Sequence, residues 1–256
     1  SDRILMNAIE IQDLRVGYGD KVLLQDLNFS IATGEVFVIL GGSGCGKSSL
    51  LKNLFGLYQP LAGDVLIDGM NITKAQGQER QNIMTRFGVM YQQGALFGSM
   101  TLLENVRLLM EEYTQLSRPE MDLLARCKLD LVGLLPYASY MPNEISGGMQ
   151  KRAAIARAIA LDPKILFLDE PSAGLDPITS ADLDQTILDL AKNLGITFVI
   201  VSHELASIYA IANRIIMLDK ESKSIIAQGD PRVLRDSSAD PRVRQFFNRV
   251  MTKEVA

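Results

Sequence analysis

The chain has 256 residues and a formal net charge of −4. This acidic balance offers no broad cationic surface, so we expect no nucleic-acid partner. Two cysteines are too few for a disulfide scaffold, and they indicate a reducing cytoplasm. No apolar run reaches the roughly 18 residues needed to cross a bilayer, so we expect a separate chain to supply any membrane part.

The N-terminal third predicts strands around one glycine-rich loop. Apolar and polar residues alternate over 8–33, which is typical of an antiparallel ribbon. The short apolar run Val36–Leu40 predicts a buried strand, followed by the loop and by a helix that begins at Lys47. Residues 64–67 and 86–91 predict two further strands.

The rest of the chain alternates helices with buried strands. Residues 101–161 predict a helical lobe inserted into the strand-bearing domain. Strands return at 165–169 and 196–201, a helix at about 178–194 separates them, and 214–228 predicts a final ribbon. This alternation favours an α/β fold.

The tail predicts helix starts at Asp230-Pro231 and Asp240-Pro241, each an N-cap followed by a proline at the first helical position. Apolar residues then recur at the spacing of one helix face: Val243, Phe246, Phe247 and Val250. Two interpretations stay open, a terminal helix packed on its own domain and a contact with a second subunit or partner.

The octapeptide Gly41–Ser48 fits the phosphate-loop pattern G-x-x-x-x-G-K-[ST] between a predicted strand and a predicted helix. Glycines let the backbone wrap the phosphates, Lys47 neutralises them, and the Ser48 hydroxyl can ligate Mg²⁺. The nucleotide contacts expected here are Gly41, Gly42, Ser43, Gly44, Cys45, Gly46, Lys47, Ser48 and Ser49.

Cys45 lies in this loop beside Lys47 and near a helix N-terminus, which favours a thiolate. We therefore expect a bulky thiol reagent to inactivate the protein and ATP to protect it. The alternative is a small, buried apolar side chain.

Acidic residues end the strand that begins at Ile165. Two carboxylates at a strand tip are costly to bury without a cation, so Asp169 is predicted to hold Mg²⁺ and Glu170 to polarise the attacking water. His203 ends a neighbouring strand, where sheet tips converge on ligands. It is predicted to contact the γ-phosphate and to hold Glu170 in place.

The positions of two further side chains in the chain predict roles in the nucleotide site. Gln92 follows a strand and precedes the helical lobe, where it can reach both Mg²⁺ and the water. Tyr18, between two glycines on the edge ribbon, can stack on adenine, and its alternative is a surface tyrosine.

The turn Ser146-Gly147-Gly148 opens a helix, so its free N–H groups and the helix dipole offer a second anion site. Two phosphate sites far apart in one sequence indicate two chains that share two nucleotides.

Together these segments resemble the ATP-binding-cassette (ABC) family over about residues 8–230, with all motifs in family order. The resemblance implies a P-loop NTPase fold: a RecA-like core, an antiparallel β subdomain and an inserted helical subdomain. It implies one domain over 8–256, divided into a core with its β subdomain (8–92 and 162–230), a helical subdomain (93–161) and a C-terminal helical tail (231–256).

In this family Gly41–Ser48 corresponds to Walker A, Ile165–Glu170 to Walker B, and Ser146–Gly148 to the signature that binds the opposite subunit's ATP. The signature usually reads Leu-Ser-Gly-Gly-Gln, and Ile145 and Met149 replace its outer residues here. The change at Met149 removes an amide, whereas the backbone donors and Ser146 remain.

The smaller loops of the family match as well. Gln92 matches the Q-loop, which adds it to the Mg²⁺ ligands, while His203 and Tyr18 match the H-loop and A-loop. The segment Ala173–Asp176 resembles the D-loop, which implies that Asp176 lies at the subunit boundary.

Short segments also resemble the Mla-type phospholipid-transport ATPases, partners of Mce-domain systems: 146–154, 93–97, 175–179 and 240–247. That resemblance implies an ATPase homodimer peripheral to the cytoplasmic face of a bacterial inner membrane. Its partners would be a transmembrane permease, an Mce-domain protein and, in some members, a small STAS-domain subunit. Membrane contact would run only through the permease, whose cytoplasmic helix would enter a groove near Gln92–Met100 beside the exposed residues Leu96, Phe97 and Met100. The alternative for these three residues is the core of the lobe, which would account for two of them.

Rival functions differ in what they require. An ABC importer for another substrate, such as amino acids, shares every catalytic residue. A non-transport ABC ATPase of DNA repair or translation needs a coiled-coil insert, a tandem cassette or a basic surface, and the sequence shows none. A catalytically silent binding module is disfavoured by Glu170 and His203.

Overall fold

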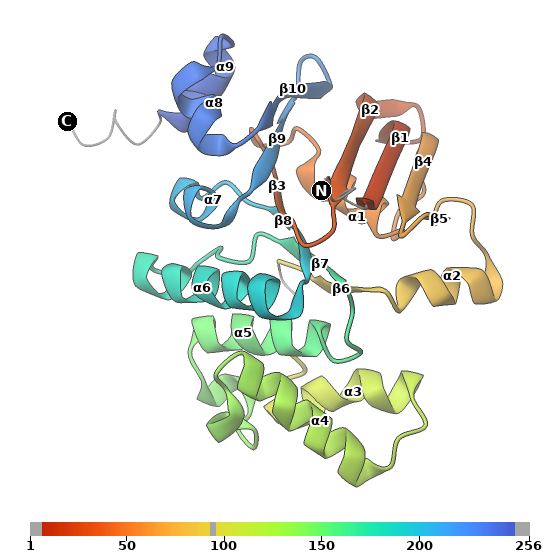
Figure 1. Cartoon of the computed structure of the whole chain (residues 1–256), viewed down its shortest axis with the longest axis vertical. Coiled ribbons are helices and arrows are strands. Elements are labelled where there is room, and N and C mark those ends of the chain that lie inside the picture. Colours follow the sequence, from red (N-terminus) through yellow and green to blue (C-terminus); the bar gives the residue numbers. More distant parts are fainter. Residues whose placement is uncertain (1–6, 93–95, 249–256) are drawn as a thin grey trace, which may run out of the picture.

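A computed structural model of the chain describes residues 7–92 and 96–248 (Figure 1). Within these residues, the central sheet has the strand order β10-β9-β3-β8-β7-β6. Strands β9, β3, β8, β7 and β6 run parallel, and β10 is antiparallel to β9. The bounds are β3 Val36–Gly41, β6 Phe87–Met90, β7 Ile165–Asp169, β8 Thr197–Val201, β9 Arg214–Asp219 and β10 Ser224–Gly229.

A second, antiparallel sheet has the order β2-β1-β4-β5 in the part of the chain that the structure describes. Its long hairpin pairs β1 (Asn7–Tyr18) with β2 (Lys21–Ala32), which confirms the ribbon predicted over 8–33. The predicted strand 64–67 lies within β4 (Ala62–Ile67), which pairs with β1 and with the short β5 (Met70–Asn71).

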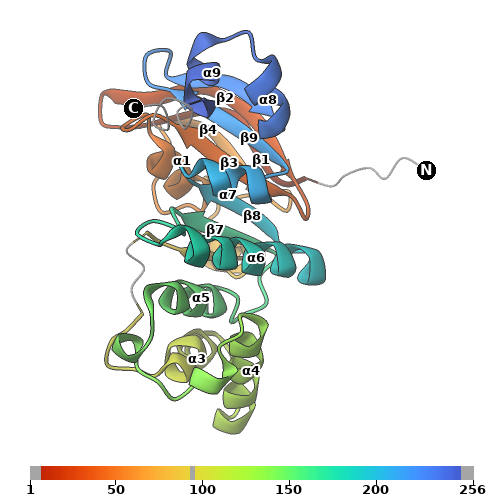
Figure 2. The same cartoon turned by 90° about the vertical axis from the view of Figure 1, so that its left-hand side faces the viewer.

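Strands β3, β8 and β7 in the middle of the central sheet are buried on both faces, as expected for nearly continuous apolar runs. Along β3, Phe37 and Ile39 face α1 (Lys47–Leu54) and the second sheet, whereas Val38 and Leu40 face the helices of the opposite side. Figure 2 shows these layers from the side. Full burial of one such side chain is worth about 1.5–3 kcal/mol, so the sheet is a rigid platform for the loops at its edges.

Helices α3 (Leu102–Tyr113), α4 (Arg118–Leu131) and α5 (Gly147–Ala158) form the lower part of Figure 1 and confirm the helical stretch predicted over 101–161. Between α4 and α5 lie the 3₁₀ helices η1 (Leu135–Tyr137) and η2 (Pro142–Glu144). The subdomain boundaries themselves stay a prediction. None of the helices in the described ranges is long and apolar enough to cross a membrane.

Three further helices, α6, α2 and α7, lie outside the helical lobe. The predicted helix at 178–194 is α6 (Pro177–Leu194). Two short helices, α2 (Gly77–Met84) and α7 (Leu205–Ile211), were not predicted. In α2 the buried side chain is Ile83, so the sequence carries no apolar stripe there.

The tail forms α8 (Pro231–Ser237) and α9 (Pro241–Phe247), with the predicted caps: Asp230 accepts from the Arg232 N–H and Asp240 from the Arg242 N–H. The apolar residues Val243, Phe246 and Phe247 are buried in the core of their own domain. This confirms the first interpretation of the stripe for these residues, and Val250 lies outside the described part of the chain.

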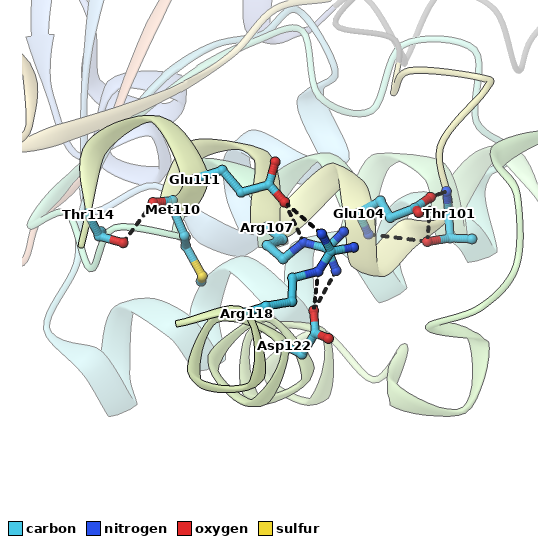
Figure 3. Close-up of polar contacts among 8 residues, drawn as sticks. All are labelled: Thr101, Glu104, Arg107, Met110, Glu111, Thr114, Arg118 and Asp122. Atoms are coloured by element: carbon cyan, nitrogen blue, oxygen red, sulfur yellow. Dashed lines mark hydrogen bonds and ion pairs between the residues drawn. The ribbon is translucent and has the colours of Figure 1, made fainter. Parts of the chain in front are cut away.

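A buried arginine ties the helical lobe together. Arg107 of α3 is 5% exposed and bonds Glu111 one turn later, at 2.7 Å, and Asp122 of α4 (Figure 3). Arg118 lies at the rim of the same cluster, 3.8–3.9 Å from both carboxylates. Thr101 and Glu104 form a capping box at the start of α3.

We expect Arg107→Ala to lower the free energy of unfolding by about 3 kcal/mol, because it removes a buried cation that joins two helices. Arg118→Ala is the matched control. Its side chain is exposed, so its loss should cost less than about 1 kcal/mol. Urea denaturation of the nucleotide-free protein measures both, and equal losses would contradict this account.

Candidate nucleotide site at the edge of the central sheet

The carboxyl ends of β3, β7 and β8 meet at one edge of the sheet, because these strands are parallel neighbours. Strand β3 ends in Gly41, β7 in Asp169, and His203 lies two residues beyond β8. The structure therefore gathers the phosphate loop, the acidic pair and the histidine, as predicted. Ligands bind at this edge in open α/β sheets.

The phosphate loop closes on itself through Lys47, whose Nζ donates to the carbonyls of Gly41 and Gly42 at 3.0 Å each. Gly41 has φ 152°, and a Cβ there would lie 2.6 Å from the Leu218 carbonyl oxygen and from the Cys45 sulfur. A side chain therefore cannot be accommodated at this position. The lysine ammonium sits where it can exchange carbonyl oxygens for phosphate oxygens.

Ser48 and Asp169 form an oxygen pair, with the Ser48 hydroxyl donating to Asp169 Oδ1 at 3.1 Å. Burial raises the pKa of Asp169, while the Ser48 hydrogen bond and the charges of Lys52 and Lys47 oppose the rise. A desolvated carboxyl beside a hydroxyl fits Mg²⁺, which takes one or two protein oxygens and completes its shell with water and phosphate. The donor set therefore suits the predicted metal.

Glu170 and His203 are in direct contact. The imidazole Nδ1 lies 2.9 Å from both carboxylate oxygens of Glu170, and Nε2 lies 3.3 Å from Glu204 Oε1. Glu170 adopts φ 49°, which is uncommon for a residue with a side chain, and its N–H donates to the Val201 carbonyl at 2.9 Å. The predicted contact between His203 and Glu170 is thus present, and the nearby Glu204 was missed although it is adjacent in sequence.

Gln92 and Tyr18, the remaining residues predicted for this chain's own site, lie at or beyond the ends of strands in two different sheets. Gln92 is exposed two residues beyond β6, the neighbour of β7 in the sheet. Tyr18 ends β1 and its hydroxyl lies 2.9 Å from the Ser49 hydroxyl of α1. Tyr18 is 49% exposed, and its ring forms a T-shaped pair with Tyr58 whose centroids lie 5.6 Å apart, a partner that no sequence signal identified. A half-exposed aromatic ring beside the loop is accessible to a base.

The signature turn lies elsewhere in the same chain. Ser146 caps α5 and accepts from the Met149 N–H at 3.3 Å. Figures 1 and 2 both place α5 on the opposite side of β7 from α1, which follows the phosphate loop. The N–H groups of Gly147 and Gly148 are therefore available to an anion that this chain's own loop does not hold.

The segment predicted as the D-loop packs against this turn. Asp176 caps α6, accepts from the N–H groups of Ile178 and Thr179 at 3.0 Å, and from the Thr179 hydroxyl at 2.5 Å. These bonds fix the Thr179 side chain, whose methyl would lie 2.1 Å from a Cβ at Gly148. Glycine is therefore required at position 148 by its neighbour in the same chain.

The expectation that Cys45 favours a thiolate is wrong. Its side chain is 2% exposed, and burial raises the pKa of the thiol more than nearby Lys47 lowers it. The alternative, a small buried apolar side chain, describes the structure.

We expect Cys45 to react with a bulky maleimide far more slowly than Cys127, which is exposed on α4 and serves as the internal control. Mass spectrometry of peptides after timed labelling measures both rates. Labelling of Cys45 as fast as that of Cys127 in the folded protein would contradict the burial.

We expect Gly148→Ala to lower the free energy of unfolding by about 1–3 kcal/mol, because its methyl group overlaps that of Thr179. Adding Thr179→Ser should restore most of the loss, since serine keeps the hydroxyl that bonds Asp176 and lacks the methyl. Nucleotide-free urea melts of both single variants and the double variant test this. A double variant no more stable than Gly148→Ala would exclude the overlap as the cause.

Comparison with known proteins also indicates an ATP-binding protein. A family model described as "ABC transporter" matches residues 24–173. "Probable ribonucleotide transport ATP-binding protein mkl" of Mycobacterium leprae is 42% identical over 94% of this chain and 69% of its own length. "Intermembrane phospholipid transport system ATP-binding protein MlaF" of Escherichia coli K12 is 36% identical over 96% of this chain and 91% of its own length.

Solved structures share the fold. "Dimeric Structure of MJ0796, a Bacterial ABC Transporter Cassette" has a TM-score of 0.77 and 32% identity, over 87% of this chain and 98% of that chain. A second structure of that cassette, described as a post-hydrolysis state bound to ADP and Pi, has a TM-score of 0.74 and 30% identity over the same shares. The motifs, the sheet topology and these relatives agree: the chain belongs to the ATP-binding-cassette family and is an ATPase of the ABC transporter type.

Proposed function

We propose that this protein is the ATPase subunit of a transporter in the bacterial inner membrane that moves phospholipid between that membrane and the cell envelope. Two copies would close on two ATP molecules and drive a transmembrane permease from its cytoplasmic face. The observation that carries the ATPase part of the proposal is the pairing of His203 with Glu170 beside the Asp169–Ser48 contact, because these are the groups we propose for ATP hydrolysis.

Each group at the sheet edge has a distinct part in this proposal. Residues 41–49 bind the phosphates, and Tyr18 stacks on the adenine. Ser48, Asp169 and Gln92 would hold Mg²⁺, which supplies charge neutralisation at the phosphates when bound. Glu170 accepts a hydrogen bond from the attacking water and takes up its proton. His203 orients the Glu170 carboxylate and contacts the γ-phosphate.

The separation of the signature turn from the phosphate loop supports two cooperating copies. Ser146, Gly147 and Gly148 of one copy would bind the γ-phosphate of the ATP held by residues 41–48 of the other. Asp176 at the head of α6 would then lie at the subunit boundary. Closure converts ATP binding into a movement of the helical lobes, and hydrolysis reopens the pair.

A groove between the core and the helical lobe supports the permease contact. Its volume is about 1110 Å³, and its apolar wall includes Met84, Val89, Tyr91, Phe97, Leu109 and Tyr113. Phe97 is 51% exposed as expected. Leu96 is buried in the core of the lobe, as the alternative predicted, and Met100 is half-buried. We propose that a cytoplasmic helix of the permease enters this groove.

The lipid substrate rests on the relatives. The Escherichia coli protein, named for phospholipid transport, aligns over almost its full length, whereas this chain spans 69% of the mycobacterial protein named for ribonucleotide transport. An Mce-domain protein and a small STAS-domain subunit are the further partners we propose; of the segments that suggested the Mla group, Gln93, Gly94 and Ala95 lie outside the described residues. An importer for another substrate is the alternative.

We expect Glu170→Gln to bind ATP, to hydrolyse it more than about 100-fold more slowly and to accumulate as a closed dimer, because the amide cannot accept the proton of the attacking water. Phosphate release and sedimentation velocity measure the two effects. Glu221→Gln, an exposed position in the turn between β9 and β10, is the matched control. Normal turnover in Glu170→Gln would exclude Glu170 as the base.

The transport proposal is tested by purifying the protein with the permease encoded beside it and extracting bound lipid. We expect phospholipid to co-purify and its transfer between vesicles to depend on ATP. A permease that binds an amino acid or a nucleotide, with no ATP-dependent lipid transfer, would replace the lipid function with the importer alternative.

A further inference from the structure

Helix α5 is fixed to the central sheet at its C-terminal end. Its last residue, Ala158, lies so close to β6 that a Cβ on Gly88 would be 2.1 Å from the Ala158 carbonyl oxygen. The same virtual Cβ would be 2.7 Å from the Leu166 side chain of β7. Backbone packs directly on backbone here, so this end of α5 moves with the sheet.

The other end of α5 is separated from the sheet by a cavity of about 260 Å³. The cavity lies between the residues that follow β6, the first turns of α5 and the segment before α6: Met90, Tyr91, Gln92, Gly147, Lys151 and Leu175 are among its walls. On the side that faces Gln92, the signature end of α5 therefore borders open space, whereas on its other side Gly148 packs on Thr179 of α6.

One hydrogen bond crosses this space. The Lys151 ammonium donates to the Gln92 backbone carbonyl at 3.2 Å. Lys151 is half-buried, and burial lowers the pKa of its ammonium. It lies one helical turn after Gly147, so Lys151 and the signature turn occupy the same face of α5.

We propose that Lys151 is the positioning residue that transmits the engagement of Gln92 with the nucleotide to the signature turn. When the Gln92 side chain turns toward the phosphates and the metal, its carbonyl moves with the same backbone. The Lys151 ammonium follows the carbonyl and shifts the N-terminal end of α5 against its contact with Thr179, while the end at Ala158 stays fixed on β6. This inference rests on the proposed function, because it takes Gln92 as the group that senses the nucleotide.

The test measures closure without turnover. In the Glu170→Gln background, an ATP titration followed by sedimentation velocity gives the ATP concentration at which half the protein is dimeric. Adding Lys151→Met, which keeps the length of the side chain and removes the donor, should raise that concentration about tenfold. Lys151→Arg keeps a cationic donor and should restore it to within about twofold. Lys192→Met, at an exposed position of α6, is the control for loss of a positive charge.

Two further measurements separate this role from simple loss of structure. Binding of a fluorescent ATP analogue to the dilute monomer and the urea midpoint should both match those of the Glu170→Gln parent. Should Lys151→Met fail to fold, Lys151→Gln takes its place and carries the same expectation.

An unchanged midpoint of dimer formation in Lys151→Met, with normal nucleotide binding, would overturn the inference and leave the proposed function standing. A shift that Lys151→Arg does not reverse, or that Lys192→Met reproduces, would overturn it as well. If the Glu170→Gln parent forms no ATP-dependent dimer, the proposed function fails first and this inference fails with it.

Discussion

The parallel direction of neighbouring strands is the constraint on which the site depends. Because β3, β8, β7 and β6 share one direction, their carboxyl ends form one edge and place Gly41, His203, Asp169 and Gln92 in line along it. Every residue of β3, β7 and β8 is buried, so the rigid core holds this edge in place. Chemistry that needs several groups within a few ångströms is thereby assembled from segments more than 150 residues apart.

The two carboxyl groups at this edge are buried, which makes their charge costly unless it is paired. Asp169 and Glu170 are 7% and 8% exposed, and both sit where a carboxylate has lost most of its water. The structure offsets that cost with the Ser48 hydroxyl at Asp169 and the imidazole of His203 at Glu170. Such a site is stabilised further by a cation and by phosphate, which links nucleotide binding to the order of the loops around it.

In the proposed mechanism, the helical lobe is the part that moves. Arg107 joins α3 to α4, so the lobe is rigid within itself. Helix α5 packs on β6 at its C-terminal end, and its N-terminal end borders a cavity on the side that faces Gln92. A rigid lobe on such a connection can rotate as a body. The groove of about 1110 Å³ lies along the same connection, so a partner seated in it would sense that rotation.

The sequence predicts the parts whose signals are local. Val36–Leu40 followed by Gly41–Ser48 specifies a strand, a loop and a helix, and all three are found. The sequence does not predict properties that depend on residues far away along the chain. The pKa of Cys45 depends on burial under residues far along the chain, Leu96 is covered by the lobe, and Thr179 meets Gly148 through the tertiary fold. Helix α2 has too few buried side chains to leave a pattern.

The central claim is that one ATP is held by two copies of this chain. A structure of the protein with Mg²⁺ and a non-hydrolysable ATP analogue tests it most directly. We expect the phosphates to lie on residues 41–49 of one copy, with Ser146 and Gly147 of the second copy against the γ-phosphate. A nucleotide enclosed by a single copy, or a dimer in which the signature turns face away from the nucleotides, would contradict the account.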